Sequence, residues 1–303
     1  MLGSPSYTGP ERRKAVRWRP RPVRLLLALF VLLVVGYMSA VIWLMTQETR
    51  LVFQAGATLG PARPSFPFEQ VDVPRPDGQR QFAWRMSSGQ GDDAPWVLFL
   101  HGNAATIASN VNISHYRVLK SVGANILAPE YRGFSGLDGT PTEETLAVDA
   151  RAAYDYLRGP LHVPAPRIVV YGWSLGSAVA VRLASEVEQA AVILEGAPAS
   201  IADIGQQQYP FFPIRLVMRS RFDSFQRVDR IRAPMLFLHS PEDEVIPIGE
   251  GRRLYDAARA EKRFVEVRGG HVYASSADEP RFVATISAFL QQHGLGAGAP
   301  APR

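Results

Sequence analysis

The sequence of 303 residues contains no cysteine, and only three of its 33 basic residues are lysines. The absence of cysteine excludes disulfide bonds, thiolate zinc sites, iron–sulfur clusters, a cysteine nucleophile and lipid attachment through a cysteine. No pair of histidines has the spacing of metal ligands, so the residues predict no metal site. The preference for arginine over lysine is typical of a GC-rich bacterial genome.

An excess of positive charge is absent from most of the chain, although the formal net charge is +5. Residues 1–24 hold seven basic side chains and one acid, whereas the rest of the chain holds 26 basic and 27 acidic residues. A near-neutral body has no basic face that could neutralise a run of phosphates, so nucleic-acid binding is disfavoured. The length and the 47% of hydrophobic residues suffice for one large core and exclude a disordered tail.

Residues 25–45 contain no charged side chain. As a helix rising ~1.5 Å per residue, a run of this length spans a bilayer core. A cleaved signal peptide is the alternative, but it would have a shorter apolar core of roughly 7–15 residues and a small-residue cleavage site. The nearest such sites, at 38–40 and 55–57, fit poorly. We therefore expect an uncleaved transmembrane helix, with the basic segment 1–24 in the cytoplasm and the body across the membrane, in a bacterial periplasm.

The chain beyond this helix is expected to form a linker at 46–66, an α/β domain at 67–292 and a flexible tail at 293–303. Hydrophobic runs predict strands at 68–73, 80–86, 96–100, 125–129, 167–171, 191–195, 234–239 and 263–267. Helical patterns lie near 106–121, 142–158, 175–188, 248–260 and 279–292. Parallel neighbours need a crossover connection, so only the first two strands can pair as a simple antiparallel hairpin. These patterns predict one mostly parallel sheet of about eight strands with helices on both faces.

The motif GWSLG at 172–176 falls between a predicted strand and a predicted helix. A nucleophile on so sharp a turn needs glycine on either side, because flanking Cβ atoms would collide. The N-terminus of the following helix would favour an anion that forms on a substrate. Ser174 is therefore the candidate nucleophile.

A serine nucleophile needs a base, and the base needs a carboxylate to orient it. His271, on a glycine-rich turn after the last predicted strand, is the candidate base. Asp243, directly after the strand at 234–239, is the candidate acid. Its neighbours Glu242 and Glu244 are expected to be solvated, and Glu195 at the end of another strand is the rival acid.

The oxyanion of a tetrahedral intermediate needs preorganised N–H donors. The backbone N–H of Leu175, directly after the nucleophile, is the first candidate. The second should come from the turn after the strand at 96–100, where Asn103 is preferred and Ala104 is the alternative. His101 in this turn is expected to brace the loop rather than to act as a ligand or base.

Several motifs in order resemble the α/β-hydrolase superfamily, and more narrowly its Bem46-like branch, which includes membrane-anchored relatives of the ABHD type. They are HGNA at 101–104, YRGFSG at 131–136, GTPTEETLAVDA at 139–150, GWSLGSAVA at 172–180, PEDEVIP at 241–247 and GGH at 269–271. The resemblance covers most of residues 68–292 and implies the α/β-hydrolase fold with the same three catalytic residues. Ala105 and Val272 depart from it, since relatives often have glycine and asparagine there.

The expected activity is cleavage of an ester, thioester or amide bond through an acyl-enzyme intermediate, without cofactor or metal. A small-molecule or lipid-like acyl compound is the expected substrate. A membrane-tethered serine peptidase of the aminopeptidase type is the main alternative, and a non-catalytic binding module with this fold is the minor one.

An insertion at about 197–232 is expected to cap the site. Its aromatic residues could line an acyl pocket or pack the insertion onto the sheet, and they are Tyr209, Phe211, Phe212, Phe222 and Phe225. Arg132 could bind a carboxylate of the substrate, but it is expected to brace the loops near the site. Asp149, Arg151 and Asp155 are expected to form a solvated helix face.

Protein that lacks residues 1–50 is expected to be soluble and to have no affinity for DNA or RNA, because the excess positive charge lies in residues 1–24. An electrophoretic mobility-shift assay with both nucleic acids measures this. Affinity that persists in the truncated protein would contradict the charge argument.

Overall fold

The computed structural model describes residues 9, 22–55, 63–91 and 94–296. The chain divides into two compact units, Met1–Leu44 and Met45–Arg303, which we describe separately. Most of the predicted basic segment 1–24 and the end of the predicted tail 293–303 lie outside the described residues.

Helix α1 (Pro22–Phe53) contains the uncharged run and is long and apolar enough to cross a membrane, with a mean hydropathy of 2.8 over its most apolar window. It extends beyond both predicted ends, 25 and 45. Residues 46–53, predicted as part of the linker, are therefore helical instead. Neither glycine nor proline occurs between Gly36 and Gly56, so no residue of that kind stops the helix at 45. The truncation that removes residues 1–50 would therefore cut the chain inside α1.

The described residues of the unit Met45–Arg303 form one sheet of eight strands in the order β1-β2-β4-β3-β5-β6-β7-β8. The strands are β1 (Glu69–Asp72), β2 (Phe82–Met86), β3 (Trp96–Leu100), β4 (Asn125–Pro129), β5 (Ile168–Trp173), β6 (Ala191–Glu195), β7 (Met235–His239) and β8 (Lys262–Glu266). β2 pairs antiparallel with β1 and β4, and every other pairing is parallel. The predicted fold class is confirmed.

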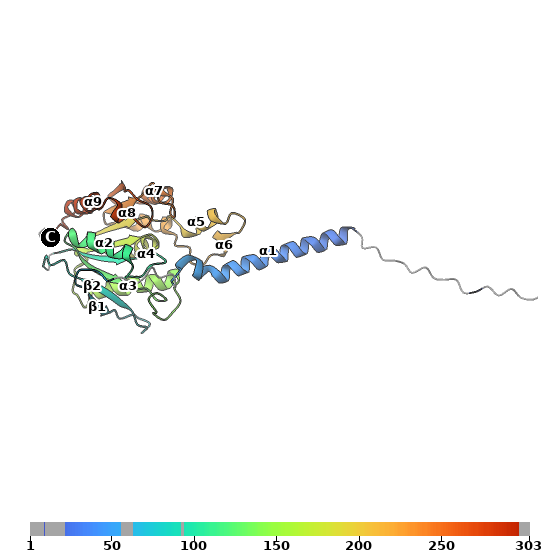
Figure 1. The fold of residues 1–303 in the computed structure, drawn as a ribbon, viewed down its shortest axis with the longest axis horizontal. Coiled ribbons are helices and arrows are strands. Elements are labelled where there is room, and N and C mark those ends of the chain that lie inside the picture. Colours follow the sequence, from blue (N-terminus) through green and yellow to red (C-terminus); the bar gives the residue numbers. More distant parts are fainter. Residues whose placement is uncertain (1–8, 10–21, 56–62, 92–93, 297–303) are drawn as a thin grey trace, which may run out of the picture. The chain divides into compact units, whose positions relative to one another are not determined.

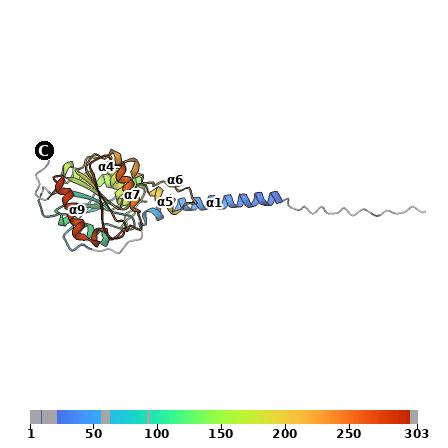
Figure 2. The same ribbon diagram turned by 90° about the horizontal axis from the view of Figure 1, so that it is seen from above.

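Helices cover both faces of this sheet (Figures 1 and 2). They are α2 (Asn110–Ser121), α3 (Glu143–Arg158), α4 (Leu175–Ala184), α5 (Ile201–Gln208), α6 (Ile214–Val217), α7 (Ile248–Ala257), α8 (Ala274–Ala277) and α9 (Glu279–Gln292). Short 3₁₀ turns lie at Ala165–Arg167, Ser224–Gln226 and Val228–Arg230. The predicted insertion at 197–232 contains α5 and α6.

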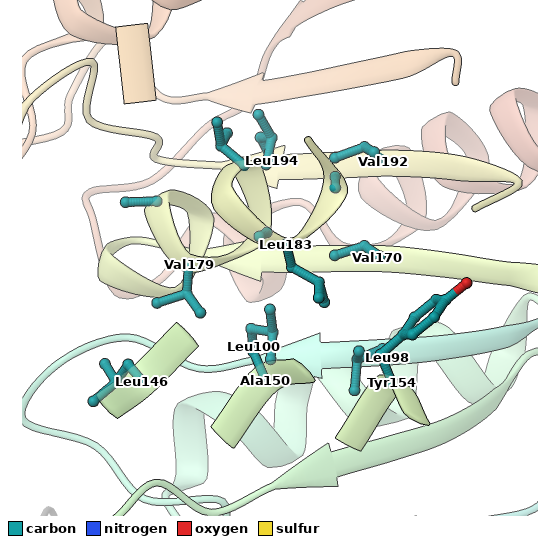
Figure 3. Close-up of a cluster of buried hydrophobic side chains, with 14 of the residues drawn as sticks. Leu98, Leu100, Leu146, Ala150, Tyr154, Val170, Val179, Leu183, Val192 and Leu194 are labelled. Atoms are coloured by element: carbon teal, nitrogen blue, oxygen red, sulfur yellow. The ribbon is translucent and has the colours of Figure 1, made fainter. Parts of the chain in front are cut away.

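Successive side chains of the central strands point to opposite faces of the sheet, so the hydrophobic core has two halves, one on each face. Leu98 and Leu100 of β3 belong to the half that contains residues of α3, α4 and α7, whereas Val97 and Phe99 belong to the half that contains residues of α2 and α9. Figure 3 shows the first half, where the strands meet residues of α3 and α4. Burial on both faces explains why β3 to β7 read as continuous apolar runs.

Two glycines let α4 approach the neighbouring strands closely. A Cβ on Gly176 would lie 2.0 Å from the carbonyl oxygen of Leu100, and a Cβ on Gly172 would lie 2.4 Å from the carbonyl oxygen of Gly176. Both obstacles are backbone atoms, so no side-chain movement can relieve the overlap. The turn from β5 into α4 therefore requires glycine at these two positions.

We predict that Gly176→Ala lowers the free energy of unfolding by about 3 kcal/mol or more, because the added methyl group overlaps the backbone of β3. Gly249→Ala in α7 is the matched control, since no atom lies within 4 Å of its added Cβ. This control should change the free energy by less than about 1 kcal/mol. Thermal unfolding followed by circular dichroism compares the two, and equal melting temperatures would refute the packing argument.

Candidate active site

Ser174 occupies the sharp turn between β5 and α4 with a positive φ of 55°. This region is costly for a residue with a side chain, and it persists where the surroundings impose it. The Ser174 N–H donates to the carbonyl of Glu195 at 2.8 Å, and the Ser177 hydroxyl donates to the carbonyls of Gly172 and Glu195 at 2.7 and 2.9 Å. These bonds fix the turn to the end of β6.

The structure brings the three predicted residues together from three separate loops. The His271 Nε2 lies 2.7 Å from the Ser174 Oγ, and the His271 Nδ1 lies 2.8 Å from the Asp243 Oδ2. The other oxygen of Asp243 accepts the backbone N–H groups of Val245 and Ile246 at 2.9 and 2.7 Å. With Nδ1–H donating to the carboxylate, Nε2 is an acceptor for the serine proton.

The surroundings of Asp243 favour its charged form. Burial opposes ionisation, but the hydrogen bond and charge of His271, together with the Ile246 and Val245 N–H groups, outweigh it and hold the pKa of Asp243 below its usual value. The carboxylate therefore stays ionised at neutral pH and can stabilise a positive charge on His271.

Glu195, the rival acid, has a different partner. One of its carboxylate oxygens lies 2.8 Å from the His115 Nε2 and accepts the Tyr171 hydroxyl. Burial opposes the charge on His115, but Glu195 outweighs it and raises the pKa of His115 above its usual value. This buried pair, which the sequence did not predict, supports the end of β6 rather than the ring of His271.

Glu244 does more than the expected solvated side chain would. Its carboxylate accepts the backbone N–H of His271 at 3.0 Å. A Cβ on Gly270 would lie 2.6 Å from this carboxylate, so the glycine leaves room for it. Glu244 therefore fixes the loop that carries His271, and a loop-to-loop contact of this kind has no signal in the sequence.

His101 braces the loop after β3, as expected. Its ring nitrogens lie 2.9 Å from the Glu130 Oε1 and 2.8 Å from the Gly102 carbonyl oxygen. The second oxygen of Glu130 accepts the Ile107 N–H and the Ser135 hydroxyl. Fully buried Glu130 thus ties the HGNA loop to the YRGFSG loop.

The backbone pattern favours Asn103 over Ala104 as the second oxyanion donor. The Ala104 N–H already donates to the carbonyl of Phe53 at 3.1 Å. Within the described part of the chain, no acceptor lies on the N–H of Asn103. The N–H of Leu175, at the first position of α4, has no intrahelical partner either. A Cβ on Gly102 would lie 3.1 Å from the Ser174 Cβ, which shows how closely this loop passes the serine.

A second buried charge cluster corrects the predicted solvated helix face. Asp149 is fully buried, and its carboxylate accepts Arg75 and Arg132 at 2.8 and 2.7 Å. Arg132 therefore braces the loops, as expected. Arg151 and Asp155 do form the expected exposed i,i+4 pair at 2.9 Å.

The large apolar side chains of the insertion differ in exposure: some pack onto the rest of the molecule, and others point outward. Phe222 is buried and meets the ring of Phe53 edge to face at 5.9 Å between centroids. Phe225 lies under the guanidinium of Arg253 at 4.7 Å. Phe211 and Leu216, in contrast, are 85% and 86% exposed, so part of the insertion presents apolar side chains outward.

Comparison with known proteins finds a hydrolase family model, sequence relatives and solved structures that resemble this chain. A family model described as "Alpha/beta hydrolase family" matches residues 97–283. An uncharacterized protein from Mycobacterium tuberculosis is 34% identical over 258 residues, which cover 84% of this chain and 89% of that protein. The lysophosphatidylserine lipase ABHD12 of Danio rerio is 29% identical over 59% of this chain, which spans about half (53%) of the lipase. An esterase from Pyrococcus furiosus, Pf2001, shares the fold with a TM-score of 0.64, at 20% identity over 75% of this chain and 91% of the esterase.

We predict that Glu244→Ala lowers kcat about fivefold, equivalent to about 1 kcal/mol, because the loop that carries His271 loses an acceptor. Glu242→Ala is the matched control, since the nearby Glu242 is exposed and, among the described residues, no hydrogen bond joins its carboxylate to that loop. Steady-state kinetics with a chromogenic ester compares the variants. Equal rates for both would remove Glu244 from the site.

Proposed function

The chain belongs to the alpha/beta hydrolase family, and we propose that it is a membrane-anchored serine hydrolase that cleaves an ester, thioester or amide bond. The observation that carries this proposal is the unbroken series of hydrogen-bond distances from the Ser174 Oγ through His271 to Asp243. A nucleophile within reach of a base, which is itself oriented by a carboxylate, is the arrangement that acyl transfer requires.

In the proposed reaction, the Ser174 Oγ attacks the carbonyl carbon while the His271 Nε2 takes the serine proton. The carbonyl oxygen becomes an oxyanion that accepts the N–H groups of Leu175 and Asn103. Collapse of this intermediate breaks the bond to the leaving group, which His271 protonates. Water then attacks the acyl-enzyme with His271 as base, which releases the carboxylic acid and restores Ser174.

Carboxylic esters, including those of lipids, and thioesters fit the chain better than peptides do. The relative from Danio rerio is named as a lipase, and Pf2001 is named as an esterase. An activity of the carboxylesterase, lipase or thioesterase type is therefore the preferred form of the proposal.

A peptidase of the aminopeptidase type would need a carboxylate for the substrate's amino terminus. In the insertion, both oxygens of Asp203 already pair with arginines, Arg215 and Arg253, each at 2.6 Å. Asp223 accepts the Gln226 amide at 3.0 Å. Asp203 therefore offers no open site for an ammonium group, which disfavours this alternative.

Helix α1 supports anchoring in a membrane. Its length, hydropathy and exposed apolar surface are those of a membrane span. Seven basic residues within 1–24 favour the cytoplasm for the N-terminus, so we place the hydrolase domain in the periplasm of a bacterium.

We predict that Ser174→Ala abolishes labelling by a fluorophosphonate probe and lowers ester hydrolysis about 10⁴-fold or more, because it removes the hydroxyl that lies 2.7 Å from the His271 Nε2. Ser276→Ala, which removes an exposed hydroxyl of α8, should label as the wild type does. The same proteins are then assayed on acyl esters and thioesters of graded chain length and on aminoacyl amides. Undiminished labelling of Ser174→Ala would refute the nucleophile, and a preference for the amides would favour the peptidase.

A further inference from the structure

The last turn of α1 lies directly on the loop that carries the second oxyanion donor. The side-chain amide of Asn103 donates from Nδ2 to the carbonyl of Val52 at 3.1 Å. The backbone N–H of Ala104 donates to the carbonyl of Phe53, also at 3.1 Å. Two consecutive carbonyls of the helix thus hold two consecutive residues of the loop.

The chemistry of a helix end explains why these carbonyls accept. The last carbonyls of an α-helix have no intrahelical donors and must find partners elsewhere. Gln54, with a positive φ of 47°, ends the helix, and its side-chain amide donates to the carbonyl of Leu51. The next two carbonyls, of Val52 and Phe53, take their donors from the loop after β3.

The loop held in this way is strained at the same place. Ala104 has a positive φ of 52°, which is unfavourable for a residue with a Cβ. Its N–H bond to Phe53 helps to fix that conformation. The N–H of Asn103 belongs to the peptide group that joins Gly102 to Asn103. The next peptide group contains the Ala104 N–H, and because Phe53 holds it, the bond to Phe53 also constrains the direction of the Asn103 N–H.

The helix end is itself fixed in the core. Phe53 is fully buried and belongs to the same hydrophobic cluster as Leu100, at the end of β3, and Leu175, the first residue of α4. Earlier in α1, the Glu48 carboxylate accepts the backbone N–H groups of Arg219 and Ser220, which lie in the insertion. Residues 48–53 therefore contact the loop after β3 through Val52 and Phe53, and they contact the insertion separately through Glu48.

We propose that the last turn of α1 positions the oxyanion hole, with the side chains of Asn103 and Phe53 as the positioning residues. The bond from Asn103 and the buried ring of Phe53 hold the Val52 and Phe53 carbonyls against the loop, which aims the Asn103 N–H at the oxyanion. The inference rests on the proposed function. It makes the segment that directly follows the membrane span a part of the support of the active site.

The test is a kinetic comparison of full-length wild type with Asn103→Ala and Phe53→Ala in the same detergent. Asn103→Ala keeps the backbone N–H but loses the bond to Val52, and Phe53→Ala loses the buried ring. Each should lower kcat for a short acyl ester about tenfold and leave KM within about twofold. The oxyanion forms in the transition state and is absent from the bound substrate, so its donors affect kcat rather than substrate binding. Affinity for a trifluoromethyl ketone, whose adduct with serine carries the oxyanion, should fall by the same factor as kcat.

Two variants separate positioning from simple stability. Glu48→Ala breaks the contact of the same helix with the insertion and leaves the loop untouched, so its kcat and ketone affinity should match the wild type. Phe53→Leu keeps an apolar side chain in the core and should restore most of the kcat that Phe53→Ala loses. Melting temperatures are recorded for every variant.

The positioning role is overturned if Asn103→Ala and Phe53→Ala keep wild-type kcat and ketone affinity. It is also overturned if they lose melting temperature while ketone affinity and kcat stay unchanged. A wild type that reacts with neither fluorophosphonate nor ester would instead refute the proposed function. Reactive wild type with insensitive variants would refute only the positioning role.

Discussion

The positive φ of Ser174 is the constraint on which the site depends. It is possible because Gly176 carries no side chain where α4 passes the backbone of β3, and because Gly172 leaves room for the first turn of α4. The carbonyl of Glu195 also holds the Ser174 N–H. The same turn places the serine hydroxyl beside His271 and leaves the N–H of Leu175 unused at the start of α4. The candidate nucleophile and the candidate oxyanion donor are thus set by one backbone conformation. It follows β5, which pairs with β3 on one side and with β6 on the other.

Buried charges around this turn each have a partner, and most of them connect loops. Glu130 joins the loop after β3 to the loop after β4 through His101 and Ser135, and Asp149 joins α3 to Arg75 and Arg132. A buried carboxylate without such partners would be strongly destabilising, whereas a fully bonded one fixes the geometry of its neighbours. Strands therefore supply the framework, and paired charges with the end of α1 hold the loops that carry the chemistry.

Much of this arrangement could be predicted from the sequence, because the deciding signals are local. Apolar runs of five or six residues mark β3 to β7, and GWSLG between such a run and a helical pattern marks Ser174. The partners of Glu195, Glu244 and Asp149 could not be predicted, since each lies far away along the chain or across a loop. The end of α1 is an intermediate case. The absence of glycine and proline between Gly36 and Gly56 was a usable signal for the helix, but the contact of Phe53 with the loop after β3 had no signal in the sequence.

The central claim is that one serine, activated by His271 and Asp243, forms a covalent bond to the acyl group. Peptide mapping by mass spectrometry after reaction of the intact wild type with a fluorophosphonate tests this most directly, because it locates the adduct on a single residue. We predict one adduct per chain, on the peptide that contains Ser174. An adduct on any other residue, or no adduct from a protein that hydrolyses esters, would contradict it.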